Sequence, residues 1–428
     1  MNASGRRRIV AFVAAAIGVA LAVVLLLVSS GSDTLHRPDA KHSPEPNSLE
    51  APSAAADEFS PITASTLGSP STAVPGTDEQ WHLVYELHLT NVRPQPSTVE
   101  SIDVLDAANE GRIVETFSGA DLQRRLRTLG SRPTTSLALE PNGARLVLIE
   151  LDFDGPEDVP NALVHRFHVL TAPVDGGSAY AQTAYMAAPL PLDGGATVVG
   201  PPLTGAGWVA GNGCCATDGV HRATVLPING ALHAAQRFAI DWIRLDSQGR
   251  LVNGDPADVR SYTAYGADIV AVAGGTVVGA LDTLDDQIPG QLPDPGTITL
   301  ENVLGNHVTV RHGDGRYATY AHMQKGSVAV GVGSSVLPGQ TLGRIGNTGN
   351  TSAPHLHFQI TEGRSVLGSD GLPFVVDRFR LQGRMNAQRW AAATTLEGTW
   401  NEGLLPSPSP RSAEIPLDVD IVDFGDRR

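Results

Sequence analysis

Apolar residues follow three different patterns along this chain of 428 residues. The first is an uncharged apolar run from Ile9 to Val28, which closely follows the basic residues Arg6–Arg8. A run of about twenty apolar residues can cross the hydrocarbon core of a bilayer as a helix. The basic residues predict that segment 1–8 stays in the cytoplasm, that 9–28 is a single-pass transmembrane signal anchor, and that the rest is exported to the cell surface side of the membrane. A cleaved signal peptide and a secreted form are the alternative, although no clear cleavage site follows the run.

The second pattern is alternation of apolar and polar residues, and it begins after a long polar stretch. Residues 29–77 are rich in Ser, Pro, Ala and Thr and predict a disordered linker. From Trp81 to Leu89 every second residue is apolar, as in a strand that buries one face. Short strands of this kind recur up to about residue 170, so we expect a β-sandwich, immunoglobulin-like in type, over residues 78–185. Its sequence shows no catalytic constellation, so this domain is expected to be a spacer or a module that docks to wall polymer or to a cell-division protein.

The third pattern consists of short apolar runs separated by glycine-rich corners, without a helical period. It predicts an antiparallel β-sheet domain over residues 205–385, which makes the fold class all-β apart from the N-terminal helix. Two Gly- and Pro-rich insertions, 246–265 and 282–297, interrupt it and could form the walls of a substrate groove. The stretch 404–428 is rich in Pro and Ser and then acidic, and it predicts a disordered tail.

One strand of this domain carries candidate chemistry. His355 and His357 are two residues apart, so they share one face of a strand while Leu356 and Phe358 share the other. One imidazole of such a pair can bind a metal ion while the other handles substrate or water. His322 ends the returning strand of a hairpin that turns at Asp314-Gly315.

Composition narrows the functional classes. The formal net charge of −15 argues against nucleic acid as a partner. The two cysteines are adjacent, Cys214 and Cys215, and in an exported chain they could form a vicinal disulfide or pair between molecules. Thiolate ligation of a metal is conceivable, but a tight local loop is the favoured interpretation.

Several motifs occur in a fixed order in the second half of the chain: Gly305-Asn306, His312-Gly313, Thr319-Tyr320-Ala321-His322, Pro338-Gly339-Gln340, Gly346-Asn347-Thr348-Gly349 and Pro354-His355-Leu356-His357-Phe358. In this order the chain resembles the lysostaphin/LytM-type zinc metalloendopeptidases over about residues 205–380. The resemblance implies a zinc-dependent hydrolase of peptidoglycan with a small β-sheet core. It also implies that Asp241 and His357 bind Zn²⁺ and that His322 and His355 are catalytic residues that bind substrate and help to activate water.

One position departs from the pattern of that family. The family places its first zinc-binding histidine four residues before the aspartate, where this chain has Arg237. A guanidinium does not lose its proton in a protein, so Arg237 cannot bind zinc. His221 and His233 are the upstream alternatives. We favour His221, because the turn sequence Pro227-Ile228-Asn229-Gly230 would return the chain beside it.

These observations predict a membrane metallopeptidase that acts on stem or cross-bridge peptides of peptidoglycan outside the cytoplasmic membrane. Two imidazoles and a carboxylate would leave the fourth position of a tetrahedral zinc ion for water, as in catalytic sites. The alternative is a degenerate, non-catalytic module of the same fold that binds cell wall or activates another hydrolase. A protein of cell division or wall synthesis is a candidate partner in either case. The sequence does not identify the bond that is cleaved.

Overall fold

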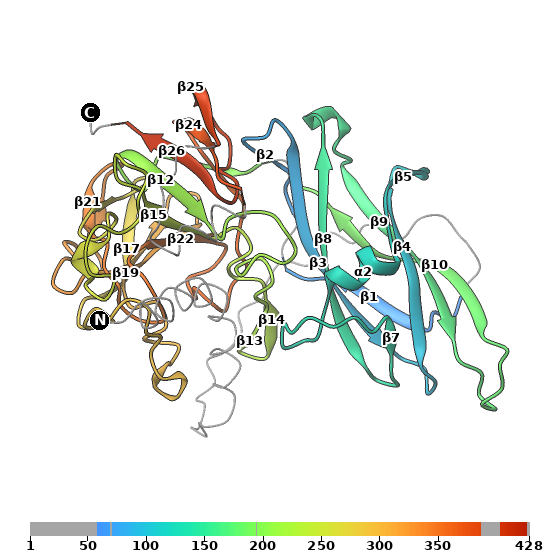
Figure 1. The fold of residues 1–428 in the computed structure, drawn as a ribbon. Helices are drawn as coiled ribbons and strands as arrows, with labels where there is room; N and C mark the ends of the chain where they lie inside the picture. Colours follow the sequence, from blue (N-terminus) through green and yellow to red (C-terminus); the bar gives the residue numbers. More distant parts are fainter. Residues whose placement is uncertain (1–57, 69–70, 194, 387–402, 426–428) are drawn as a thin grey trace.

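The chain folds into two β-sheet domains that lie side by side (Figure 1). The computed structural model describes residues 58–68, 71–193, 195–386 and 403–425. The predicted cytoplasmic segment 1–8, the transmembrane helix 9–28 and most of the linker 29–77 lie outside the described residues. Within the described ranges no helix is both long enough and apolar enough to cross a membrane.

The first domain consists of two five-stranded sheets that enclose a common core. One sheet has the order β1-β3-β8-β6, with β2 beside β3, and the other has the order β10-β9-β4-β5, with β7 beside β4. The bounds are β1 (Ile62–Thr66), β2 (Val74–Pro75), β3 (Trp81–Asn91), β4 (Ser97–Asp106), β5 (Asn109–Ser118), α2 (Gly119–Arg125), β6 (Leu126–Arg127), β7 (Ala138–Leu139), β8 (Ala144–Phe153), η2 (Pro156–Asp158), β9 (Ala162–Thr171) and β10 (Ala181–Pro191).

Strand β3 is buried on both faces, whereas the sequence predicted one buried face. Leu83, Tyr85 and Leu87 point into the core of the first domain. Val84, on the other face, belongs to the core cluster of the second domain, and Glu86 has no exposed surface. The polar positions of this strand therefore face a neighbouring domain instead of water.

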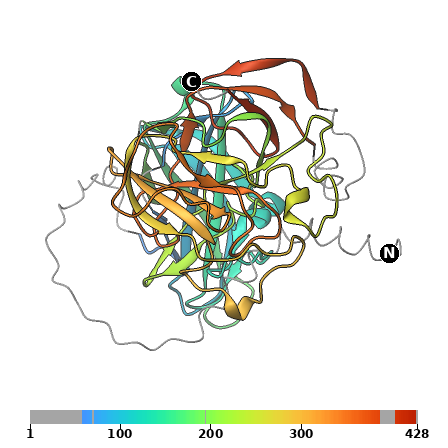
Figure 2. The same ribbon diagram turned by 90° about the vertical axis from the view of Figure 1, so that its left-hand side faces the viewer.

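The second domain is built on a ten-stranded antiparallel sheet, with the order β20-β17-β18-β19-β22-β15-β12-β26-β24-β25. Figure 2 shows this domain in front of the first. Three two-stranded sheets, β11 with β23, β13 with β14 and β16 with β21, complete it. The bounds are β11 (Thr197–Val199), β12 (Gly205–Gly211), β13 (Leu226–Ile228), β14 (Ala231–His233), β15 (Ile240–Arg244), η3 (Val259–Ser261), β16 (Asp268–Val270), β17 (Gly275–Leu281), η4 (Pro295–Thr297), β18 (Asn306–His312), β19 (Tyr317–Met323), β20 (Ser335–Val336), β21 (Thr341–Arg344), β22 (Leu356–Thr361), β23 (Phe374–Val376), β24 (Phe379–Arg384), β25 (Leu404–Arg411) and β26 (Asp420–Phe424).

The all-β prediction is confirmed for the described residues, in which α2 is the one α-helix. The predicted bounds of the first domain, 78–185, are too narrow. Part of the expected linker 29–77 forms β1 and β2, because Ile62 and Val74 are fully buried and pair with β3. At the other end β10 continues to Pro191.

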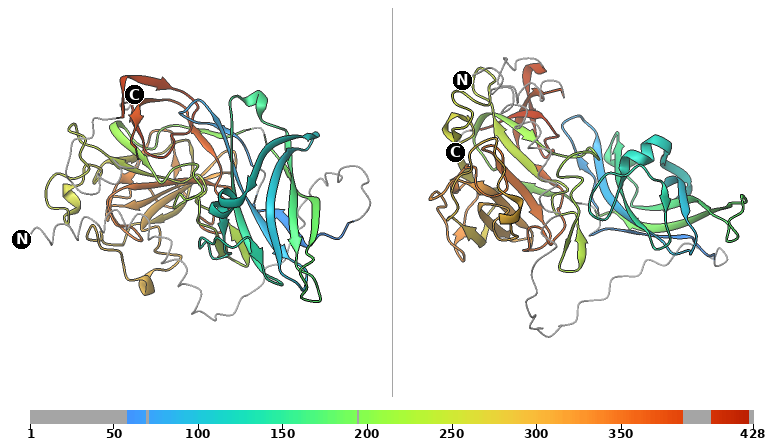
Figure 3. Two further views of the ribbon diagram at one scale, coloured as in Figure 1. Left: turned by 45° about the vertical axis from the view of Figure 1, so that its right-hand side comes forward. Right: turned by 60° about the horizontal axis from the view of Figure 1, so that its bottom comes forward.

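The predicted disorder of the tail 404–428 is wrong for its described residues, and the domain bounds 205–385 omit strands that belong to the sheet. Strand β26 lies between β12 and β24 (Figure 3). Its Val422 and Phe424 are buried in the domain core. The Pro/Ser-rich stretch forms β25 at the edge of the sheet. Proline lacks an N–H group and is tolerated in edge strands, so its abundance was a poor signal of disorder here.

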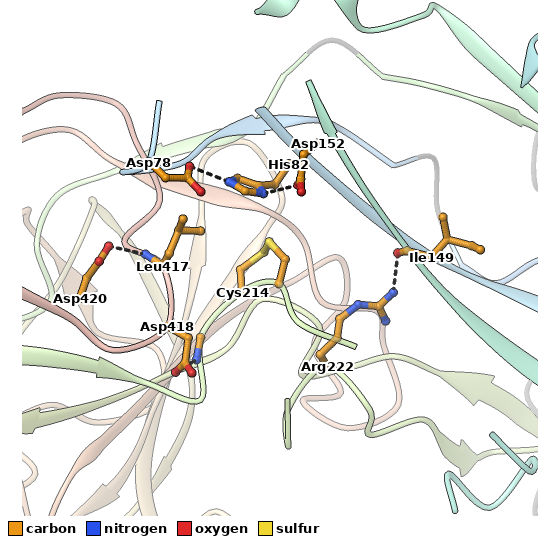
Figure 4. The surroundings of a disulfide bond; sticks show 11 residues. Asp78, His82, Ile149, Asp152, Cys214, Arg222, Leu417, Asp418 and Asp420 are labelled. Atoms are coloured by element: carbon orange, nitrogen blue, oxygen red, sulfur yellow. Dashed lines mark hydrogen bonds and ion pairs between the residues drawn. A yellow bond between two sulfur atoms is a disulfide. The ribbon is translucent and has the colours of Figure 1, made fainter. Parts of the chain in front are cut away.

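Cys214 and Cys215 form a vicinal disulfide directly after β12. Both residues are buried and pack in the core of the second domain. Figure 4 shows this disulfide between the segment that carries Arg222 and the loop that carries Asp418. The tight local loop of the sequence interpretation is thus present, and neither thiol is left as a metal ligand.

Candidate metal centre

The candidate centre is built on neighbouring strands in the middle of the ten-stranded sheet. Asp241 of β15 lies directly opposite His357 of β22 in the antiparallel register. Directly paired residues project from the same face of a sheet, so these two side chains meet. On the other face of β22, Leu356 and Phe358 pack in the domain core, as their alternation predicted.

His221, Asp241 and His357 form one compact group of potential metal ligands. One donor atom from each of the three side chains lies within 4.8 Å of the other two. His357 Nδ1 is 2.9 Å from Asp241 Oδ1, and His221 Nε2 is 3.4 Å from Asp241 Oδ2. The two histidine residues are 6% and 3% exposed, so the group is closed to bulk water on most sides.

The turn that the sequence predicted places His221 in this group. Strands β13 and β14 pair as a hairpin around Asn229-Gly230; His221 lies before this hairpin, and the returning chain contacts it at Ala239. The His221 ring donates its Nδ1–H to the carbonyl oxygen of Ala239 at 3.1 Å, which directs Nε2 towards Asp241. His233 lies in β14 opposite Leu226 and is not a member of the ligand group.

Arg237 points away from the centre, into the boundary between the two domains. It is 3% exposed, and its Nη2 lies 2.5 Å from Oε2 of Glu86 in β3. At the position where the resemblance implies a ligand, the chain therefore has an ion pair with the first domain.

His322 and His355 lie beside the ligand group and are both oriented by backbone carbonyls. His322 donates Nδ1–H to Thr348 O at 2.8 Å, and His355 donates Nδ1–H to Ala353 O at 2.8 Å. Each ring therefore keeps an unprotonated Nε2 when neutral. The His355 Nε2 is 3.3 Å from Asp241 Oδ1. The ring centroids of His322 and His355 are 4.8 Å apart.

The glycine-rich motifs shape the backbone around His322. Gly305 has φ of +64°, and a Cβ atom there would lie 2.1 Å from the Thr348 carbonyl oxygen that accepts the His322 proton. The Thr348 hydroxyl accepts a hydrogen bond from the Asn306 N–H at 2.8 Å and donates to Met323 O at 2.9 Å. The Asn306 amide in turn binds both backbone groups of Leu284, so one buried side chain fixes the insertion 282–297.

Two residues that the sequence analysis did not select also contact the centre. Gln359 Oε1 accepts the Nε2–H of His357 at 2.7 Å, and Asn212 Nδ2 donates to Asp241 Oδ2 at 2.7 Å. Gln359 follows His357 by two residues on the same strand, and this spacing was a usable signal. Asn212 follows the end of β12, and nothing in its local sequence indicated the contact.

The pKa shifts reflect burial and the mutual contacts of the group. Burial lowers the pKa of His221 to about 4, so this imidazole is neutral near pH 7. Burial and the neighbouring His355 hold the pKa of His322 well below its usual value. For Asp241 burial acts upward, but the surrounding His221 and His355 outweigh it and hold its pKa well below the usual range. A neutral His221 imidazole next to an ionised Asp241 carboxylate is the protonation state in which these groups bind metals. For His355 burial acts downward, but the neighbouring Asp241 carboxylate outweighs it and raises its pKa.

Comparison with known proteins finds similarity to peptidases over part of the chain. Residues 258–367 match Peptidase family M23. Peptidoglycan DD-endopeptidase ShyA of Vibrio cholerae is 41% identical over 63 residues, and DD-carboxypeptidase/endopeptidase Mpg of Neisseria meningitidis is 40% identical over 55 residues. Among solved structures, the catalytic domain of lysostaphin from Staphylococcus simulans shares 24% identity with a TM-score of 0.21, over 34% of this chain and 80% of that chain.

These matches cover limited parts of each protein. The ShyA match spans 14% of this chain and 14% of the relative, and the Mpg match spans 13% and 12%. The family match contains His322, His355 and His357, whereas His221 and Asp241 precede it. Two of the three members of the ligand group therefore lie outside the family match.

Proposed function

Starting from the M23 peptidase domain that this chain contains, we propose that the protein is a zinc-dependent endopeptidase that hydrolyses peptide bonds of peptidoglycan. The observation that carries this proposal is the meeting of His221, Asp241 and His357, with His322 and His355 beside them. The names of the relatives, which are peptidoglycan DD-endopeptidase and DD-carboxypeptidase/endopeptidase, support the substrate class.

The donor set fits a catalytic zinc site. Two imidazoles and one carboxylate are ligands that zinc takes in catalytic sites, where a fourth position stays open for water. The ligand atoms of a tetrahedral zinc ion lie roughly 3.3 Å apart when the bonds are about 2.0 Å long. The Asp241 carboxylate comes close to this spacing, with Oδ1 2.9 Å from His357 Nδ1 and Oδ2 3.4 Å from His221 Nε2, and one donor atom of each of the three side chains lies within 4.8 Å of the other two. When bound, the ion would acidify a water molecule and polarise the carbonyl of the scissile bond.

His322 and His355 supply the proton chemistry in this proposal. Each holds its Nδ1–H on a backbone carbonyl, so each presents Nε2 on the side of the ligand group. A neutral imidazole can accept a proton from water at Nε2 and return it to the leaving amine. The same atom, once protonated, can donate a hydrogen bond to the developing oxyanion.

We place the catalytic domain outside the cytoplasmic membrane, where its substrate lies. The apolar run Ile9–Val28 after Arg6–Arg8 supports this location, because a signal anchor of that orientation exports the rest of the chain. Peptidoglycan peptides would be the substrate, and a cell-division or wall-synthesis protein remains a candidate partner for the first domain.

The alternative of a non-catalytic module requires that Arg237 replaced a zinc ligand and that no other residue supplies the missing ligand. The approach of His221 Nε2 to Asp241 weighs against that alternative, because a third donor is available from another segment.

The test is the metal content and the peptidoglycan digestion of the full chain and three variants. We expect near-stoichiometric zinc in the wild type, little or none in His221→Ala and Asp241→Ala, and unchanged zinc in His233→Ala. Digestion of purified peptidoglycan, followed as newly released amino groups, should depend on zinc in the same pattern.

His233→Ala is the matched control, because His233 lies in the same hairpin segment but outside the ligand group. A wild type that binds no zinc after reconstitution would refute the enzyme and favour the binding module. Zinc lost in His233→Ala and kept in His221→Ala would reverse the ligand assignment.

A further inference from the structure

The two domains meet through buried charges as well as apolar contacts. Glu86 in β3 has no exposed surface, and Arg222 and Arg237 of the second domain, 1% and 3% exposed, both pair with it. Buried charges are costly unless each is paired and hydrogen-bonded in good geometry. A carboxylate shared by two guanidiniums therefore tightly restricts the segments that carry the two arginines.

The hydrogen bonds of Arg222 extend into the sheet of the first domain. Its Nη1 donates to Glu86 Oε1, and its Nη2 donates to the carbonyl oxygens of Tyr85 at 2.8 Å and Ile149 at 2.9 Å. Figure 4 shows Arg222 reaching Ile149 in β8. Arg237 donates from Nε to Glu86 Oε1 at 3.2 Å and from Nη2 to Oε2 at 2.5 Å. Both guanidiniums thus donate to one carboxylate, Arg237 through two nitrogens and Arg222 through one.

The two arginines lie within the segment 221–241, which begins and ends with two of the three candidate ligands. Arg222 directly follows His221, and Arg237 precedes Asp241 by four residues. His221 lies outside the strands, and the segment contains turns and the short hairpin β13–β14. Such a segment has few backbone ladder bonds to fix its position, so side-chain anchors determine where His221 lies.

We propose that Glu86 is a positioning residue for the metal centre: through Arg222 and Arg237 it holds the His221 imidazole beside Asp241. This inference rests on the proposed zinc-dependent function. Metal ligands need to be held within about half an ångström of their productive positions. The first domain then sets the metal affinity of the second. Arg237 stands where the lysostaphin/LytM-type family has a zinc-binding histidine, and here it anchors the segment of His221 instead.

The experiment compares zinc affinity among full-length variants by competition with a chromophoric chelator, well below their melting temperatures. Glu86→Gln keeps the volume and one acceptor oxygen but removes the charge that both arginines share. We expect its zinc dissociation constant to rise at least tenfold and its peptidase activity to recover at saturating zinc. Glu86→Asp, which restores the charge, should recover part of the affinity.

Val74→Ala is the matched control, because Val74 is a fully buried residue of the first domain that packs in the second domain's core. It should lower the melting temperature and leave zinc affinity within twofold of wild type. Arg222→Lys is the second test, since it keeps the charge but loses the fork, and it decides the question if Glu86→Gln does not fold. Folded variants with wild-type zinc affinity would overturn the inference alone, whereas a wild type without zinc would overturn the proposed function and the inference with it.

Discussion

Gln359 provides the sharpest test of how the candidate centre prepares His357 for a metal. Its Oε1 is 2.7 Å from His357 Nε2, and its own Nε2 donates to the carbonyl oxygens of Ala235 and Val366. The side chain is therefore fixed as an acceptor towards His357. This contact keeps the His357 proton on Nε2 and leaves the Nδ1 lone pair facing Asp241 and His221.

The expected loss follows from where the missing hydrogen bond acts. In Gln359→Met, the metal-free protein can move the His357 proton to Nδ1, which then donates to Asp241 Oδ1 at 2.9 Å. In the proposed zinc-bound state it cannot, because Nδ1 would be the ligand atom, and the Nε2–H would remain buried without an acceptor. Gln359 is 1% exposed, and water has little access there. An unsatisfied buried donor costs about 1–3 kcal/mol, so zinc affinity should fall by roughly 10- to 100-fold.

The assay is chelator competition at pH 7.5, together with the ¹⁵N chemical shifts of the His357 ring, which report the tautomer. Gln359→Glu keeps an acceptor and should stay within about tenfold of wild type. Thr309→Val is the control for general destabilisation, because it removes the buried hydrogen bond between Thr309 and Thr319 in the same sheet. Zinc affinity of Gln359→Met within twofold of wild type would refute this reasoning.

Three further predictions concern stability. Burial lowers the pKa of His165 from 6.5 to about 4, so its contribution is complete above about pH 6.5 and is lost as the pH falls towards 4. Relative to His165→Leu, the wild type should lose about 2 kcal/mol of unfolding free energy between pH 7 and pH 5 in urea titrations. The same dependence of unfolding free energy on pH in both proteins would contradict this. Phe424→Ala removes a buried ring 5.2 Å from that of Trp242 and should cost about 3–5 kcal/mol in the same assay, whereas a loss below 1 kcal/mol would indicate that β26 is dispensable. Gly305→Ala places a Cβ atom against Thr348 O at a φ of +64°, so its melting temperature should fall clearly below that of Gly313→Ala, where a Cβ atom would meet nothing within 4 Å.

The parts of the site that could be predicted from sequence are those with short-range signals. Alternation placed His357 on one face of a strand and Leu356 on the other, and the Asn229-Gly230 turn indicated how His221 returns to Asp241. Both inferences depend on fixed geometry within a few residues of the chain.

The parts that could not be predicted depend on contacts between distant segments. Glu86 occurs at a polar position of an alternating strand, and only the packing of a second domain buries it. Strand β25 is rich in Pro and Ser and gains its structure from pairing with β24. Local composition carries no information about such partners. The sequence therefore predicted a solvent-exposed side chain for Glu86 and a disordered segment in place of β25.

The place of β26 within the ten-stranded sheet has a consequence for how the chain must fold. Its Ile421 pairs with Val209 of β12, more than two hundred positions earlier, while its other edge pairs with β24. Strands β24 and β25 can therefore be joined to the rest of the sheet only after residues 420–424 have been synthesised. Until then the edge of β12 is open, and open edges are prone to wrong pairing with other chains. Completion of this sheet thus depends on pairing between distant segments, which is entropically costly and slow to establish.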